Sequence, residues 1–300
     1  MLFTIDRLQF ICDRLVAFEF IDLTKPQSFN IDFHKKKMEV LNNKEFFDEF
    51  ILIQHNKDNV VIGERTNHIK MNYKEFHEWF KQKNNESNQN NTTHSNSKQL
   101  NSATNNIGDP YVQGLLNEIY VDKYNNLDFN TDDNGLEIVS QTLNNESTYG
   151  FDFDLFEPTQ GIIIEFLKRE SEYITNLTSH PTRYAKNKRK FISLWNAAKR
   201  VNNKSPSLFL INYSDDPNEP IQLIIIRDFD TNLNSNKMVL SDIGYKLDGK
   251  EELLSWLKVL NTNTNKAMEY LDNLPKQERD YHFFNNVYFN KKKIRNWKEI

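Results

Sequence analysis

The chain has 300 residues but a single cysteine, Cys12, and only eight glycines and eight prolines. A lone thiol cannot form an internal disulfide, so the sequence excludes a disulfide-stapled scaffold and favours a reducing, cytoplasmic setting. No apolar run approaches the roughly 18 residues that a membrane-spanning helix needs. The first residues also lack a basic stretch followed by an apolar core, and we therefore expect neither a signal peptide nor a membrane as partner.

The patterns of several common active sites are absent as well. There is no glycine-rich loop that ends in Lys-Ser or Lys-Thr, which argues against a P-loop nucleotide site. The seven histidines form no His-Glu-x-x-His pattern and there is no cysteine pair, so a zinc site is not expected. A Gly-x-Ser-x-Gly nucleophile elbow is also missing.

The composition that remains is that of a globular protein. Hydrophobic residues make up 38% of the chain and charged residues 27%, and 22 Phe and 12 Tyr can fill a substantial core. The length is about twice the ~150 residues expected of one domain, which predicts two domains. The formal net charge of −4 argues against a nucleic-acid-binding protein, but the charges are unevenly distributed along the chain.

An asparagine-rich tract divides the sequence. Residues 83–106 contain almost no apolar side chains, so they cannot offset the entropy cost of ordering. We therefore expect a recognition or regulatory α+β domain at 1–82, a flexible linker at 83–107 and a second domain at 108–300.

Alternating and helical hydrophobic patterns predict the elements of both domains. Phe50–Ile53 and Val60–Ile62 have the signature of a hairpin, and Asn72 followed by Glu75 predicts a capping box that opens a helix to Lys81. The remaining expected elements are helices at Tyr111–Tyr124, Thr182–Val201, Lys250–Leu260 and Lys266–Leu274, and strands at Tyr149–Phe156, Ile162–Leu167, Ser207–Tyr213 and Ile221–Asp228. This order indicates an α/β or α+β fold with a mixed sheet flanked by helices. The sequence shows no internal repeat.

Two carboxylates stand out in the strands at 149–167. The strand at 162–167 is almost continuously apolar, so a charge at Glu165 is costly unless it is paired or binds a metal. If Pro158–Gly161 form a four-residue hairpin loop, Asp154 lies directly opposite Glu165. Two facing carboxylates of this kind suit Mg²⁺ or Mn²⁺, although two acids that merely end strands at the solvent edge are the alternative.

The segment that follows is strongly basic. Between Glu172 and Asp215 there is no acidic residue, whereas the same window contains eight Lys or Arg residues. Three of them, Arg183, Lys186 and Lys190, fall at i, i+3 and i+7 of the expected helix and form one basic face. A face of one sign next to a carboxylate pair predicts a polyanionic ligand such as a nucleic acid.

Together these features resemble the PD-(D/E)XK nuclease superfamily, which has the restriction-endonuclease-like fold, over about residues 110–230. The resemblance implies that Asp154 and Glu165 hold Mg²⁺ or Mn²⁺, that Lys168 orients the attacking water, and that Glu118 is the optional acid of the first helix. It further implies a metal-dependent endonuclease, acting on DNA rather than RNA in a restriction or defence setting, with a homodimer as a plausible assembly. The alternative is a module of the same fold that binds nucleic acid without cleaving it.

The sequence departs from the family pattern at the lysine. The family has Lys two residues after the Glu, where this chain has Leu167, and Lys168 points to the opposite face of a regular strand. Three solutions are open: a bulge that re-aims Lys168, a lysine supplied by the helix (Lys186 or Lys190), or an inactive site. Asp152 would replace Asp154 as ligand if the hairpin loop differed by two residues.

Overall fold

The computed structural model of the protein describes residues 1–24, 30–64, 67–89, 98–99, 109–120, 123–124, 127, 135–144, 146–169, 175–181, 188–235, 237–274 and 276–277. The chain divides into two compact units. The N-terminal unit comprises Phe3–Phe153, and the C-terminal unit comprises Asp154–Ile300 together with Met1–Leu2.

The N-terminal unit is built on five strands that lie side by side in chain order: β1 (Phe3–Ile11), β2 (Arg14–Asp22), β3 (Glu49–His55), β4 (Val60–Glu64) and β5 (Asn67–Met71). All neighbouring pairs are antiparallel except β2 and β3, which are parallel. A parallel pair needs a crossover connection, and helix α1 (Ile31–Leu41) supplies it. The Asn30 side chain caps this helix by accepting the backbone N–H groups of Asp32 and Phe33.

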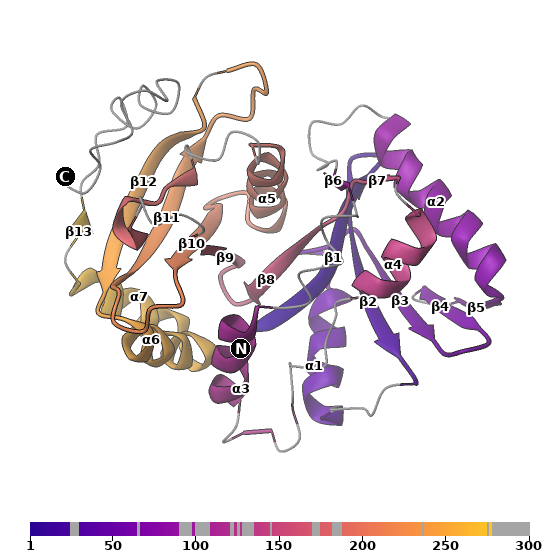
Figure 1. Ribbon diagram of the computed structural model, residues 1–300, viewed down its shortest axis with the longest axis horizontal. Coiled ribbons are helices and arrows are strands. Elements are labelled where there is room, and N and C mark those ends of the chain that lie inside the picture. The colour runs from indigo at the N-terminus through magenta and orange to yellow at the C-terminus, as the bar shows by residue number, and fades with distance from the viewer. Residues whose placement is uncertain are drawn as a thin grey trace. The chain divides into compact units, whose positions relative to one another are not determined.

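Helices cover both faces of these strands. One face packs against α2 (Tyr73–Gln89) and α4 (Leu136–Leu143), with Phe18 of β2 against Phe80 of α2 (Figure 1). On the opposite face Glu19 of β2 meets Lys37 of α1. The unit also contains α3 (Pro110–Tyr120) and a short pair of strands, β6 (Lys98–Gln99) and β7 (Ser147–Thr148).

Helix α2 extends into the first residues of the segment that was expected to be a linker. The predicted capping box is confirmed, because the Glu75 N–H donates to Asn72 Oδ1 at 3.0 Å and the Asn72 N–H donates to Glu75 Oε2 at 2.9 Å. The helix, however, continues through Gln89, so the prediction of a flexible segment from Lys83 onward is wrong for its first residues. Polar contacts stabilise this extension: buried Ser87 donates to the Phe10 carbonyl and buried Asn84 to the Ser147 carbonyl. Residues 90–97 and 100–107 of the expected linker lie outside the described residues.

The C-terminal unit contains strands in the order β13 (Lys276–Gln277), β12 (Val239–Leu247), β11 (Ile221–Phe229), β10 (Ser207–Tyr213), β9 (Ile162–Lys168) and, from Asp154 onward, β8 (Phe151–Glu157). Strands β9 and β10 are parallel and the other neighbouring pairs are antiparallel. The strands at 149–167, 207–213 and 221–228 are thus confirmed, and β10 has the predicted bounds.

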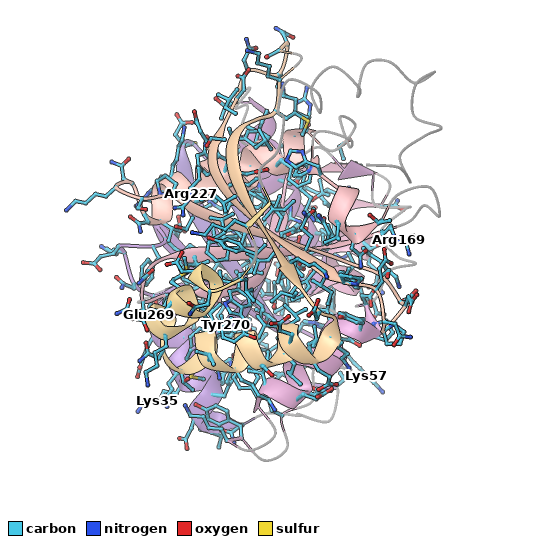
Figure 2. All side chains as sticks on the ribbon, turned by 90° about the vertical axis from the view of Figure 1, so that its left-hand side faces the viewer. Lys35, Lys57, Arg169, Arg227, Glu269 and Tyr270 are labelled. Atoms are coloured by element: carbon cyan, nitrogen blue, oxygen red, sulfur yellow. The ribbon has the colours of Figure 1, made fainter. Side chains whose placement is uncertain are left out.

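Helices again lie on both faces. Helix α5 (Lys188–Val201) lies on the face that carries Glu165 and buries its stripe of Phe191, Leu194 and Trp195. Helix α6 (Lys250–Thr262) packs on the other face, where Trp256 stacks on Phe209 of β10 with ring centroids 6.3 Å apart. Helix α7 (Thr264–Asp272) packs on α6, and the Tyr270 hydroxyl donates to Glu252 Oε1 at 2.9 Å. Figure 2 labels Tyr270 on these C-terminal helices.

The predicted mixed sheet flanked by helices is confirmed, but the compact units do not coincide with the predicted domains. The division falls within β8, between Phe153 and Asp154, and residues 110–153 group with the N-terminal strands. The reason is visible in α4, whose Ile138, Val139 and Leu143 belong to the core of the N-terminal unit. No helix in the described part of the chain is both long enough and apolar enough to cross a membrane.

We predict that Asn84 holds the extension of α2 in place. An Asn84→Ala substitution leaves the half-buried Tyr149 N–H and Ser147 carbonyl without this partner and should lower the free energy of unfolding by about 1–3 kcal/mol. The neighbouring exposed Asn85→Ala is the matched control, with an expected change within about 0.5 kcal/mol. Urea unfolding of both variants measures the difference, and equal stabilities would refute the role of Asn84.

Candidate functional site

The hairpin of β8 and β9 brings the two predicted carboxylates together. The observed pairs are Leu155 with Ile164, Phe156 with Ile163 and Glu157 with Ile162. This register confirms the predicted four-residue loop, and continuing it by one residue places Asp154 opposite Glu165. In this register Asp152 does not lie opposite Glu165, so the condition under which Asp152 would replace Asp154 as the predicted ligand is not met.

The loop itself explains the register. The Glu157 carboxylate accepts the backbone N–H groups of Thr159 and Gln160, each at 2.9 Å, which fixes the turn. Gly161 then has a φ of +69°, and a Cβ at this position would lie 2.8 Å from the Val201 Cγ1 atom of α5. Glycine therefore allows both the left-handed backbone and the close approach of the helix.

Glu165 is the most deeply buried acid of the site, with 1% of its surface exposed. Its Oε1 atom forms an ion pair with the Lys190 ammonium, which α5 projects toward β9. A carboxylate on an apolar strand is tolerated when a cation neutralises it, and Lys190 is that cation. The Lys190 side chain keeps 30% of its surface exposed, so the pair is open to solvent on the lysine side.

Asp154 is half-buried and contacts the strand that carries Glu165. Its Oδ2 atom accepts the backbone N–H of Phe166 at 2.6 Å, which is the residue directly after Glu165. This bond anchors the Asp154 carboxylate at the strand position of Glu165. The C-terminal unit thus gathers two carboxylates and one ammonium around the backbone of β9.

Lys168 does not join this group. Its Nζ atom lies 2.8 Å from Asp215 Oδ1, in an ion pair that is largely exposed. The parallel register with β10 runs without a shift from Ile162 to Lys168, so the bulge that would re-aim Lys168 is absent from this strand. The structure therefore directs Lys168 away from Glu165 and brings Lys190, one of the alternatives, to the acid.

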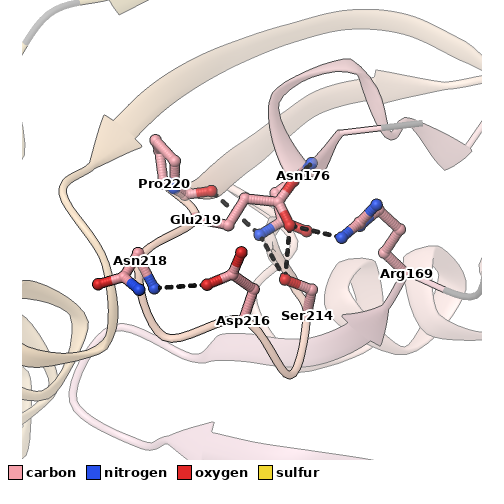
Figure 3. Close-up of polar contacts among 7 residues, drawn as sticks. All are labelled: Arg169, Asn176, Ser214, Asp216, Asn218, Glu219 and Pro220. Carbon is pink, nitrogen blue, oxygen red and sulfur yellow. Dashed lines mark hydrogen bonds and ion pairs between the residues drawn. The ribbon is translucent and has the colours of Figure 1, made fainter. Parts of the chain in front are cut away.

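A polar cluster holds the end of β9 in this orientation (Figure 3). Glu219 Oε2 accepts from Arg169 at 2.7 Å and from the Ser214 hydroxyl at 2.6 Å, while its Oε1 accepts the Asn176 N–H at 2.9 Å. The Asn176 side chain donates to the Pro220 carbonyl at 3.0 Å. These contacts tie Arg169, and with it Lys168, to the connection between β10 and β11.

The predicted basic face is only partly described. Arg183 and Lys186 lie outside the described residues. Lys190 forms an ion pair with Glu165, so its charge is not simply part of a solvated basic face. The neighbouring Lys188 is also engaged, because its ammonium donates to the carbonyls of Asn232, Ser235 and Lys237 at 2.7–2.9 Å. Burial lowers the pKa of Lys188, and nearby Asp230 opposes this shift. Lys188 thus organises the loop between β11 and β12.

Glu118, the predicted acid of the first helix, belongs to a different compact unit from Asp154 and Glu165. It lies on α3, which belongs to the N-terminal unit, and is half-buried.

A buried pair that the sequence did not reveal lies in the C-terminal unit, where His180 Nε2 and Asp242 Oδ2 are 2.7 Å apart. Only their separation of 62 residues is visible in the sequence, and neither residue falls in a recognisable motif.

Asp154 and Glu165 are the candidate ligands for a divalent metal ion. Among the described residues no group of three or more acidic, histidine or cysteine side chains forms a dedicated metal cage. Two carboxylates are nevertheless sufficient for Mg²⁺, which commonly keeps several waters and binds one or two protein carboxylates. Asp154 and Glu165 therefore fit such an ion, provided that Lys190 withdraws from Glu165.

Neither protein-family models nor curated proteins nor solved structures gave a match to this chain.

The two lysines should differ sharply in their effect on stability. Lys190→Met leaves the buried Glu165 without its cation and should lower the free energy of unfolding by about 2–3 kcal/mol, less than for a fully buried pair. Lys168→Met removes an exposed pair and should change it by less than about 1 kcal/mol. Guanidinium unfolding compares the two variants directly. A larger loss in Lys168→Met would contradict the assignment.

Proposed function

We propose that the C-terminal unit is a metal-dependent endonuclease of restriction-endonuclease-like type that hydrolyses phosphodiester bonds of DNA, in a restriction or defence setting. The observation that carries the proposal is the convergence of Asp154, Glu165 and Lys190 at one position of β9. Two acids and one lysine are the residue types that this chemistry uses. The lysine comes from the helix rather than from the strand.

In this proposal Asp154 and Glu165 are the residues that would hold Mg²⁺ or Mn²⁺. A bound divalent ion supplies charge stabilisation to a phosphate and lowers the pKa of a coordinated water. The protein's contribution is to present both carboxylates from adjacent strands. The bond from the Phe166 N–H fixes one of them, and the apolar surroundings of β9 keep the other in a low-dielectric environment.

Lys190 has two tasks. In the structure its ammonium neutralises Glu165, and its partial exposure lets it reach outward when a substrate phosphate arrives. There it would orient the attacking water and offset the negative charge that develops on the phosphate. The long, flexible lysine stem suits this exchange of partners better than a planar guanidinium would.

Binding of the DNA backbone is assigned to the basic residues around the start of α5. Arg183 and Lys186 remain predicted phosphate contacts, and such contacts position the substrate without reading its sequence. The role of the N-terminal unit in this scheme is recognition or regulation.

A second candidate is a module that binds nucleic acid without cleaving it. It is favoured by one specific observation, the pairing of Lys168 with Asp215, which leaves the strand of Glu165 without the lysine that the family pattern has there. The two candidates differ in their dependence on a metal ion and on Glu165.

The decisive experiment is a cleavage assay on plasmid DNA with Mg²⁺ or with EDTA. We expect Mg²⁺-dependent cleavage by the wild-type chain, and loss of cleavage in Glu165→Gln, because the amide keeps the shape of the side chain and removes its charge. Lys190→Met should lower the rate by about 10²–10³-fold, as for the loss of one donor that stabilises a developing charge.

Lys168→Met is the matched control and should cleave at the wild-type rate. Filter binding at several salt concentrations runs in parallel. Salt-sensitive binding without cleavage would favour the binding module over the nuclease. Cleavage that persists in Glu165→Gln would refute the site.

A further inference from the structure

The two units repeat the same order of elements. In the N-terminal unit a hairpin (β1, β2) is followed by helix α1, a strand parallel to the hairpin's second strand (β3), two antiparallel strands (β4, β5) and helix α2. In the C-terminal unit β8, β9, α5, β10, β11, β12 and α6 follow with the same pairings. Figure 1 shows the first series in indigo and violet and the second in pink to gold.

The register agrees as well as the order. Arg7 pairs with Phe18 in the first hairpin, so the next pair outward is Asp6 with Glu19. Leu155 pairs with Ile164 in the second, so the next is Asp154 with Glu165. On the parallel neighbour Glu19 is matched with Leu52 and Glu165 with Leu210.

The polar contacts around each glutamate are also equivalent. The Phe20 N–H donates to Asp6 Oδ2 at 2.8 Å, just as the Phe166 N–H donates to Asp154 Oδ2 at 2.6 Å. A lysine of the crossover helix neutralises each glutamate: Lys37 of α1 pairs with Glu19, as Lys190 of α5 pairs with Glu165. Each unit thus contains the same four groups: two facing acids, the backbone N–H of the residue after the glutamate, and a lysine of the crossover helix.

The helix layers match too. In each unit the crossover helix lies on the face of the glutamate, and the helix after the last antiparallel strand packs on the opposite face. Phe18 meets Phe80 of α2 in the first, and Phe209 meets Trp256 of α6 in the second. A buried acid–lysine pair can arise by chance, but its recurrence at one register position, under the same helix, favours a common plan.

The copies differ in access to solvent. In the N-terminal copy the side chains of Asp6, Glu19 and Lys37 are 2%, 8% and 5% exposed, and Lys37 is held further by Asp6 at 3.6 Å and the Thr4 hydroxyl at 3.3 Å. In the C-terminal copy Lys190 is 30% exposed and Asp154 is half-buried.

We infer that the chain is an internal duplication in which each copy carries one acid–lysine centre. The centre of Asp6, Glu19 and Lys37 is sealed and joins α1 to its strands, whereas the centre of Asp154, Glu165 and Lys190 is open, so that only Lys190 can exchange its partner for a ligand. This inference rests on the geometry and does not require the proposed nuclease activity.

The test is the rate at which each lysine of the native, full-length chain is acetylated by a water-soluble succinimidyl ester, followed by peptide mass spectrometry. Lys35, exposed on the same helix as Lys37, is the internal reference. We expect Lys37 to react at least about 100-fold more slowly than Lys35, because it reacts only when the unit opens locally, and Lys190 to react within about tenfold of Lys35. Equal rates for Lys37 and Lys190 would overturn the inference.

A second arm repeats the labelling with Mn²⁺. If the ion takes Glu165, acetylation of Lys190 should accelerate while that of Lys37 does not change. Acceleration at Lys37 would show that the N-terminal centre is open and would contradict the inference. No response at Lys190 would count against the proposed metal-dependent function, and the contrast between the two lysines would still support one sealed and one open centre.

Discussion

A negative charge on an interior strand is the constraint on which the C-terminal unit depends. Glu165 lies between isoleucines and phenylalanine on a strand flanked by two others, where an uncompensated carboxylate would cost several kcal/mol. The cation has to come from a neighbouring element, and α5 is the element that covers this face. The position of the helix, the identity of its lysine and the location of the candidate site therefore follow from one ion pair.

Contacts at both ends of α5 and of the neighbouring strands hold the Glu165–Lys190 pair in place. Lys188 fixes one end of α5 to the loop between β11 and β12, and Gly161 lets the other end approach the hairpin closely. The buried His180–Asp242 pair and the Glu219 cluster hold the connections at the ends of the strands. Such supporting contacts preorganise a polar site, because they limit the freedom of the groups that must meet a ligand.

Sequence patterns predicted the features that depend on residues close together in the chain, namely a hairpin turn and a helix cap. The loop after Glu157 determined the register that places Asp154 opposite Glu165, and the capping box marked the start of α2. The choice between Lys168 and Lys190 could not be made in this way, because it depends on how a helix docks on a strand and on Asp215 and Glu219, about fifty residues further along the chain. The asparagine-rich tract likewise suggested a boundary, whereas the packing of α4 groups residues 136–143 with the N-terminal unit. The repeat was hidden because its two copies share a register and a set of contacts rather than a run of identical residues.

One interaction can serve stability in one copy and reactivity in the other. What separates the two roles is solvent, since a lysine enclosed with two carboxylates is shielded from outside anions, whereas one that borders on water can leave its acid when a stronger anion arrives. A chain built on this plan has one sealed centre that strengthens its fold and, of the two centres described, one that is open to solvent. Under the proposed nuclease function, one chain would then cut one strand at a time, and a double-strand break would require two chains acting on opposite strands.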